Sequence, residues 1–216
     1  MTISSTFLKS ILSADVELRL DTESESESEP NSYITSYPFM IEALQGHVID
    51  AKRYVLAAHM VYGWMPTILT LVPGGTQADF SAEAAILERA RKGGVLTGLE
   101  LELLAKSVNN SIIGASKLLH FVRPDRYAIW DTKVCAFLIH GSVRFPVPRP
   151  PHSTVNRVAL YQQYQSELSK LFNEQSFNDA HQRVNKTLGY DVTAMRAAEL
   201  LMFTNAPKFI GNKKKN

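Results

Sequence analysis

The sequence predicts an all-α fold. Apolar residues recur at intervals of three and four positions along most of the chain, which is the spacing of one face of an amphipathic helix. No segment alternates apolar and polar residues over the length of a strand, and no internal repeat is present. With 216 residues, of which 45% are hydrophobic, the chain can bury one large core, or two lobes that share a cleft.

The N-terminal part and the C-terminal tail differ from the rest of the chain. Residues 1–20 are expected to form an N-terminal helix, because their apolar residues have helical spacing. Residues 21–32 form an acidic, low-complexity segment in which Glu alternates with Ser, and this composition is typical of an exposed loop. The helical body is expected to span residues 33–212, and residues 213–216 form a basic tail.

Turn and capping residues divide the first half of the body into helices. Gly46 is expected to end one helix, and Gly63 and Pro66 are expected to end the next. Thr97, followed three positions later by Glu100, has the pattern of a capping box. We therefore expect helices at residues 33–46, 49–63, 80–92, 97–109 and 112–122.

The sequence also predicts how one of these helices begins and how two of them are connected. The helix at residues 80–92 is expected to have Asp79 or Ser81 as its N-cap residue. The last two helices are separated by only a few residues, so they are expected to form a helical hairpin at about residues 99–121.

The second half of the body shows the same pattern after a proline-rich connection. The apolar run at residues 134–139 predicts a helix that Gly141 ends. Four prolines between residues 146 and 151 predict an extended segment. Further helices are expected at residues 154–173, 175–187 and 193–203.

The composition excludes several classes of protein. The single cysteine, Cys135, rules out an intramolecular disulfide and a cysteine-based zinc site, and it fits a reducing, cytoplasmic location. The six histidines are scattered without the spacing of metal ligands, so no metal site is expected. P-loop, dinucleotide-binding and G-x-S-x-G motifs are absent, and we expect no cofactor. No apolar run reaches the roughly 20 residues of a membrane span, so we expect no membrane partner.

A lone carboxylate, Asp131, lies between the apolar pair Ile129–Trp130 and the apolar run that begins at Val134. An acidic residue in such surroundings needs a partner or a chemical role. One interpretation is that Asp131 caps a helix that starts at Thr132. This interpretation is compatible with catalysis, because a capping aspartate still presents an oxygen.

An aromatic cluster lies where the second helix of the body is expected to end. Tyr62, Trp64 and Met65 adjoin Gly63 and Pro66, so their side chains could project from a helix end toward a ligand. The alternative is that they pack in the core beneath a turn.

The order of these features resembles the helix-hairpin-helix DNA glycosylases of the HhH-GPD type. In that superfamily a hairpin is followed by a helix and then by a loop that ends in an apolar–Asp–Thr/Ser/Arg–basic–apolar string, like residues 130–134 here. The pair Ala115–Ser116, with the string at residues 128–134, is most similar to the 8-oxoguanine DNA glycosylase branch. The resemblance implies a two-lobed helical fold with a central cleft, and it implies that Asp131 is the catalytic carboxylate.

The resemblance also implies a substrate and a set of contacts. These enzymes flip the target base out of the duplex, and Tyr62, Trp64 and Met65 are our candidates for the residues that stack on the base or fill the gap. The DNA backbone is expected to bind to the hairpin and to nearby basic residues, namely Asn110, Ser111, Gly114, Lys117, Arg123, Arg126 and Lys133.

Two departures from the superfamily pattern refine the prediction. The hairpin turn keeps one glycine, Gly114, where the superfamily has Gly-x-Gly. Ile113 stands where bifunctional members have a Schiff-base lysine, and Lys106 and Lys117 are out of register with that position. The enzyme is therefore expected to be monofunctional and to leave an abasic site without cutting the strand.

The sequence thus predicts a monomeric DNA glycosylase that acts on double-stranded DNA, and leaves two alternatives open. One is a helical nucleic-acid-binding or host-defence module without catalysis, and the other is a helical nuclease or toxin. The sequence does not identify the excised base. A bulky modified base of a viral genome is one hypothesis, in which excision would serve phage defence.

Overall fold

The computed structural model confirms the all-α fold for the part of the chain that it describes. Within that part, α-helices account for the regular structure and no strand forms. Backbone pairing across segments is limited there to two isolated bridges, Leu71 with Val108 and Val147 with Phe209. The described residues are 3, 8–12, 16–18, 32–65, 67–74 and 79–210.

The helices follow the predicted order closely. Two helices at residues 152–171 replace the single helix predicted at residues 154–173, because the chain turns at Asn156 and Arg157. The elements are a short 3-10 helix η1 (Ser10–Leu12) and the α-helices α2 (Ser32–Gln45), α3 (Ala51–Trp64), α4 (Ser81–Arg91), α5 (Gly98–Ser107), α6 (Ile112–Val122), α7 (Thr132–His140), α8 (His152–Val155), α9 (Val158–Leu171), α10 (Gln175–Leu188) and α11 (Ala194–Thr204).

The predicted N-terminal helix is described only in part. Its described residues include η1, and residues 16–18 have no helical structure. Ile11 and Val16 are buried, and the Asn205 side chain donates a hydrogen bond to the Glu17 carbonyl oxygen at 2.8 Å. The other residues of the predicted helix, the acidic segment up to residue 31 and the basic tail lie outside the described residues.

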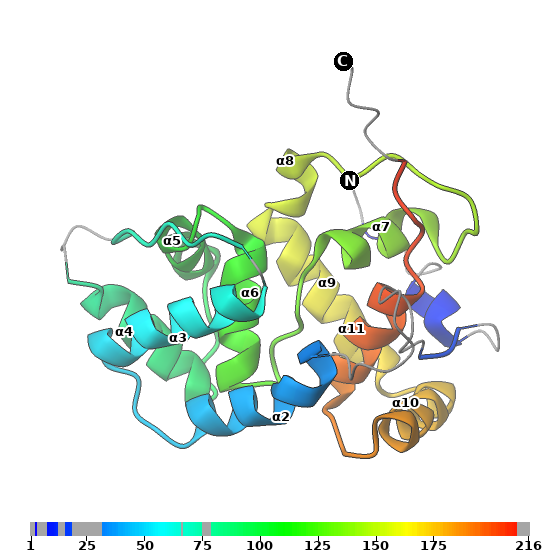
Figure 1. Cartoon of the computed structure of the whole chain (residues 1–216), viewed down its shortest axis with the longest axis horizontal. Coiled ribbons are helices and arrows are strands. Elements are labelled where there is room, and N and C mark those ends of the chain that lie inside the picture. The colour runs from blue at the N-terminus through cyan, green and yellow to red at the C-terminus, as the bar shows by residue number, and fades with distance from the viewer. Residues whose placement is uncertain are drawn as a thin grey trace.

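Helix α6 is the centre of one group of helices. It packs against α2, α3, α4 and α5, and each of its residues except Ile113 is buried. The short turn at residues 108–111 joins α5 to α6, as the hairpin prediction requires. Figure 1 shows α3, α4, α5 and α6 on one side of the molecule.

A second group of helices, α7, α10 and α11, lies on the other side in Figure 1. Helix α11 packs against α7 and α10, while α9 packs against α5 of the first group. Residues 123–131 run between the two groups (Figure 1). The buried apolar side chains of both groups form one continuous core.

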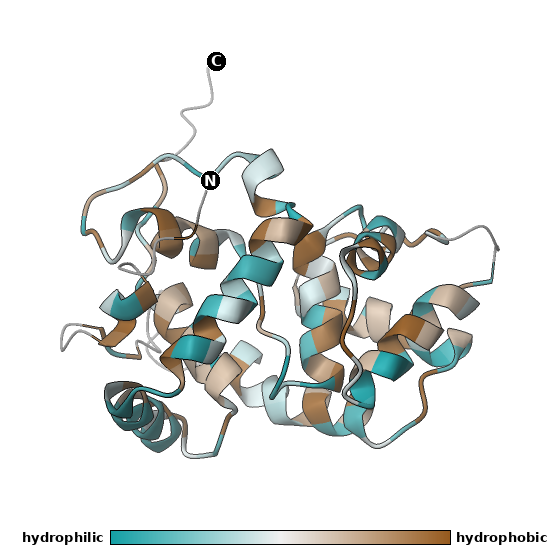
Figure 2. Ribbon diagram, turned by 180° about the vertical axis from the view of Figure 1, so that it is seen from behind, coloured by the Kyte–Doolittle hydropathy of each residue, from teal (hydrophilic) through white to brown (hydrophobic). Residues whose placement is uncertain are grey.

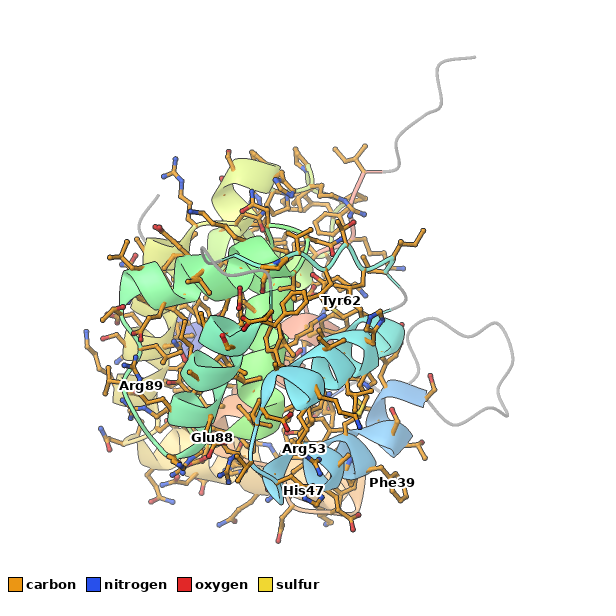
Figure 3. The ribbon with its side chains drawn as sticks, turned by 90° about the vertical axis from the view of Figure 1, so that its left-hand side faces the viewer. Phe39, His47, Arg53, Tyr62, Glu88 and Arg89 are labelled. Atoms are coloured by element: carbon orange, nitrogen blue, oxygen red, sulfur yellow. The ribbon has the colours of Figure 1, made fainter. Side chains whose placement is uncertain are left out.

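The outer surfaces follow from the apolar spacing. In α10 the buried side chains are Phe177, Ala180 and Val184, which form one narrow stripe, and Figure 2 shows the rest of this helix in hydrophilic colours. Figure 3 shows Glu88 of α4 near the connection between α2 and α3, where its carboxylate accepts the N–H of Ile49 at 2.9 Å. None of the described helices combines the length and the apolar character that crossing a membrane would require.

The predicted helix caps are partly confirmed. The capping box of Thr97 and Glu100 is present in full at the start of α5. At α4 the prediction was wrong, because Phe80 takes the N-cap position with a left-handed φ of 59°. Asp79 contributes from one residue earlier, where its carboxylate accepts the N–H and the hydroxyl of Ser81.

Gly114 is required by the packing of α6 against α3. A Cβ atom at Gly114 would clash with the hydroxyl of Tyr62, whose ring is only 3% exposed. Gly63, at an exposed position of α3, has no atom within 4 Å of the same added Cβ. The two glycines therefore allow a matched pair of substitutions.

We expect Gly114→Ala to lower the free energy of unfolding by about 1–3 kcal/mol, because the buried Tyr62 ring must move. Gly63→Ala should instead raise it by about 0.5–1 kcal/mol, because alanine favours a helix interior. Urea denaturation of both variants measures this. Equal effects of the two substitutions would contradict the packing described here.

Candidate functional site

Asp131 is positioned at the N-terminus of α7. Its Oδ1 accepts the N–H of Lys133 at 2.9 Å, and its carbonyl oxygen accepts the N–H of Cys135 at 2.9 Å. Asp131 is thus the N-cap residue of α7, which confirms the capping role predicted from the sequence. The cap fixes one carboxylate oxygen and leaves the other free to face a different group.

The other carboxylate oxygen of Asp131 faces Lys117 of α6. Lys117 Nζ lies 3.3 Å from Asp131 Oδ2, and the two side chains are 10% and 19% exposed. Lys117 was predicted to contact phosphate, but its ammonium group points into the protein and forms an ion pair there. The burial of α6 explains this, because a charged side chain on a buried helix needs a partner of opposite charge.

The segment that leads to Asp131 is anchored at several points. Ser116 of α6 accepts the N–H of Trp130 at 3.0 Å and donates its hydroxyl to the Ile113 carbonyl oxygen at 2.8 Å. The buried Trp130 side chain donates to the Val155 carbonyl oxygen at 2.6 Å. These bonds join residues 128–131 to α6 and α8, so the position of Asp131 is set by contacts distant in the sequence.

A second buried ion pair lies on α11 beside the first. Arg196 Nη1 pairs with Glu199 Oε2, and both side chains are almost fully buried. Burial raises the pKa of Glu199, the negative charge of Asp131 raises it further, and the charges of Arg196 and Lys117 lower it. The two pairs therefore form one electrostatic cluster, which we call the charge cluster: Lys117, Asp131, Arg196 and Glu199.

Trp64 borders the charge cluster. The Lys117 ammonium lies 5.6 Å from the centroid of the Trp64 ring, and the Arg196 guanidinium lies 5.7 Å from it. Phe121 and Tyr33 pack against this ring at nearly perpendicular angles. Within the described structure, Trp64 Nε1 and Arg196 Nε are buried donors without a hydrogen-bond partner. A buried donor without an acceptor is costly, so these two atoms are the least satisfied part of the surroundings of the charge cluster.

The other two aromatic-cluster candidates are placed differently. Tyr62 lies in the core, where its hydroxyl donates to the Val108 carbonyl oxygen at 3.0 Å, so we do not retain it in the candidate site. Met65 is the half-buried C-cap residue of α3, next to Trp64 in the chain. Trp64 contacts the charge cluster through its ring.

The hairpin turn forms without the superfamily's glycines. Asn109 and Asn110 take left-handed φ values of 57° and 49°, which asparagine adopts more readily than most residues. The Asn109 side chain accepts the N–H of Thr70 and donates to the Ile68 carbonyl oxygen, so it is engaged within the protein. Ser111 caps α6 by accepting the N–H of Gly114 at 3.3 Å.

The predicted phosphate contacts are separated by the length of α6. Asn110 and Ser111 lie at one end of this helix, and Arg123 and Arg126 lie at the other, about 16 Å away for 11 residues. Gly114 packs on Tyr62 rather than lining the turn, so we do not retain it as a DNA contact. The structure therefore does not gather these residues around Asp131.

Arg123 and Arg126 line a surface hollow of about 590 Å³ instead. Arg123 forms an ion pair with Asp125 at 2.8 Å and donates to the Arg91 carbonyl oxygen at 3.2 Å. Among the residues that line this hollow, none belongs to the charge cluster. Lys133, by contrast, follows Asp131 closely in the chain, and its ammonium lies 4.5 Å from the centroid of the Phe203 ring.

Two other titratable groups near the charge cluster are poor candidates for chemistry. Burial raises the pKa of the Cys135 thiol to about 12, and the charge of Asp131 acts in the same direction, so the thiol stays protonated at neutral pH. His120 accepts the hydroxyl of Tyr37 at 2.8 Å and donates to the Tyr127 carbonyl oxygen at 2.7 Å. Among the described residues, no group of three or more potential ligands could hold a metal ion.

No protein-family model, curated protein or solved structure matches the chain. The resemblance to helix-hairpin-helix glycosylases therefore rests on the quoted residues and stays a prediction.

Sequence reasoning missed Arg196 and Glu199. The signal was present, since they are the two charged residues of an otherwise mostly apolar helix.

We expect His120 to make stability depend on pH. Burial, followed by the charge of Arg196, lowers its pKa to about 3, from about 6.5 in the unfolded chain. The unfolded state thus binds the proton more readily, and stability present above pH 6.5 is lost as pH falls toward 3.

Lowering the pH from 7 to 5 should reduce the free energy of unfolding by about 2 kcal/mol through the protonation of His120 in the unfolded chain. His120→Gln should remove it, whereas the matched change of the exposed His59 to Gln should leave the pH dependence intact. Urea denaturation at the two pH values measures both. Identical pH profiles for the wild type and the His120 variant would refute the assignment.

Proposed function

We propose that the protein is a monofunctional DNA glycosylase, which flips a modified or damaged base out of double-stranded DNA and hydrolyses its N-glycosidic bond. The observation that supports this most is the placement of Asp131. Its carboxylate is held at a helix N-terminus by Lys133 N–H and by Lys117, yet 19% of the side chain stays exposed. A fixed and partly accessible carboxylate is what this reaction requires.

The chemistry explains the requirement. The glycosidic bond breaks through a sugar with oxocarbenium character, and a carboxylate nearby stabilises this positive charge. The same group can orient and deprotonate the attacking water. In the proposed mechanism Asp131 has this role, and the ammonium of Lys117 holds the carboxylate oxygen in place. The products are the free base and an abasic site.

The flipped base would enter beside Trp64. Trp64 Nε1 and Arg196 Nε are buried, so in this proposal the side chains that cover them move aside before the indole ring stacks on the base and the two donors bind its acceptor atoms. Met65, at the end of α3, is the candidate for filling the gap in the duplex. Tyr62 has no part in this proposal, because it is packed in the core.

The proposed DNA path follows the two groups of helices. The α2–α6 group would form one lobe and the α7, α10 and α11 group the other, with Asp131 in a cleft between them. Asn110 and Ser111 of the hairpin, together with Lys133, would contact the backbone near the target base. Arg123 and Arg126, at the opposite end of α6, would contact the duplex further away. We propose a monomer that acts in the cytoplasm.

A glycosylase with lyase activity is the second candidate, and the position of Lys117 favours it. A lysine amine can attack the sugar and form a Schiff base, and Lys117 Nζ is 3.3 Å from Asp131. Its ion pair argues against this role, because a protonated ammonium is not a nucleophile. Borohydride treatment during the reaction separates the two candidates: a covalent adduct with DNA that Lys117→Met abolishes would identify the lyase.

The remaining alternatives, a non-catalytic nucleic-acid-binding or defence module and a helical nuclease or toxin, predict different products. A binding module would release no base from any DNA. A nuclease would cut DNA without alkali treatment and without base loss. The role in repair or in phage defence depends on which base is released.

We expect Asp131→Asn to lower the rate of base release by roughly 100-fold or more. Asparagine also caps helices well, so α7 should stay formed, and binding of DNA by the variant is the check that loss of the ion pair with Lys117 has not unfolded it. Alkali-labile breaks in duplexes that carry different modified bases measure the release. The matched change Asp179→Asn, at an exposed position of α10, should leave the rate unchanged. Full activity of the Asp131 variant would remove the proposed mechanism.

A further inference from the structure

The basic residues are unevenly distributed along the chain. Residues 132–166 contain no Asp or Glu, and their basic residues are Lys133, Arg144, Arg149 and Arg157. After Glu199 the sequence again has no acidic residue and has four lysines. Because the net charge of the whole chain is only +2, the rest of the chain is acidic overall.

The fold brings these two acid-free segments together. Val147 donates its N–H to the Lys208 carbonyl oxygen at 2.9 Å and accepts the N–H of Ile210 at 3.0 Å, so the segments pair as a parallel bridge. Figure 1 shows the chain after α11 running toward the connection between α7 and α8. The Arg149 guanidinium covers the Phe209 ring at 4.8 Å, which joins the segments through their side chains as well.

The charged groups of this surface are exposed. Arg144, Arg149 and Lys208 are exposed, and no carboxylate of the described residues forms an ion pair with them. The aromatic side chain of Phe145 is 66% exposed next to Arg144. We call this surface the basic arm: Arg144, Phe145, Arg149 and Lys208.

The backbone of the basic arm is restricted before any partner binds. Pro146, Pro148 and Pro150 alternate with the other residues, and each fixes its own φ angle. The bridge to residues 208–210 restricts the segment further. A surface that is ordered in advance loses less conformational entropy on binding, so each charged contact adds more affinity.

The basic arm follows the end of α7 that is opposite Asp131, so a duplex that ran along α7 from a target base at Asp131 would meet the arm. Helix α7 starts directly after Asp131 and ends at His140, which is about 14 Å for nine residues. That length corresponds to roughly four base pairs at 3.4 Å per base pair. Exposed arginines that can form two hydrogen bonds each suit phosphate oxygens.

We propose that the basic arm binds the phosphodiester backbone of DNA on the flank of the target base, beyond the end of α7. This inference rests on the proposed function for the choice of DNA as the anionic partner. It adds Arg144, Arg149 and Lys208 to the DNA-binding residues, and it makes the arm a source of affinity that is independent of the chemistry at Asp131.

The test is a pair of double charge reversals in the full chain. R144E/K208E changes the arm and keeps the stack of Arg149 on Phe209 intact, while R183E/K186E makes the same change in charge on the exposed face of α10. Binding to a fluorescent DNA duplex is measured by anisotropy over a series of salt concentrations.

The arm variant should bind DNA about 10- to 100-fold more weakly than the wild type at physiological salt. The slope of log K against log salt concentration should fall by about 2, because two phosphate contacts are lost. The α10 variant should keep the wild-type slope. Equal losses in both variants, no binding of DNA by the wild type, or preferential binding of anionic vesicles through the arm would each overturn the inference.

The same measurements separate this inference from the proposed function. If the wild type binds DNA through the arm but releases no base, the inference about the basic arm is supported and the glycosylase mechanism is refuted. If base release depends on Asp131 while R144E/K208E binds DNA like the wild type, the glycosylase mechanism is supported and the inference about the basic arm is refuted.

Discussion

The ion pair between Lys117 and Asp131 is the contact on which the candidate site depends. Lys117 belongs to the central, buried helix of one group of helices, and Asp131 begins a helix of the other group. Neither charge is fully exposed, so each would be costly in this position without the other. The pair links the start of α7 to α6, and it holds one carboxylate oxygen of Asp131 while the side chain stays partly exposed.

The second ion pair, on α11, sets the electrostatic surroundings of the first. The cations of the two pairs lie 5.6 Å and 5.7 Å from the centroid of the Trp64 ring, and Trp64 Nε1 and Arg196 Nε have no hydrogen-bond partner within the described structure. Buried polar networks of this kind are expensive when only partly satisfied. A structural role alone would favour full satisfaction of every donor. The two unpaired donors are therefore the part of this network that the protein itself leaves unsatisfied.

Local sequence signals predicted the elements, while long-range packing decided the site. The capping box at Thr97 and the cap at Asp131 were predictable because their partners lie within three residues. Lys117 pairs with a residue 14 positions away in the sequence. Its partner depends on what each face of α6 packs against, and the spacing of apolar residues does not reveal this because almost every residue of α6 is buried. The break between α8 and α9 contains no glycine or proline, so no local signal marks it.

In the proposed mechanism, Lys117 and Asp131 act as one unit in base release. A double-mutant cycle can test this, with single-turnover rates of base release for Lys117→Met, Asp131→Asn and the double variant. All three variants should be slowed by similar factors, because losing either partner disables the unit. A rate for Lys117→Met close to that of the wild type, or slowing factors that multiply in the double variant, would contradict it.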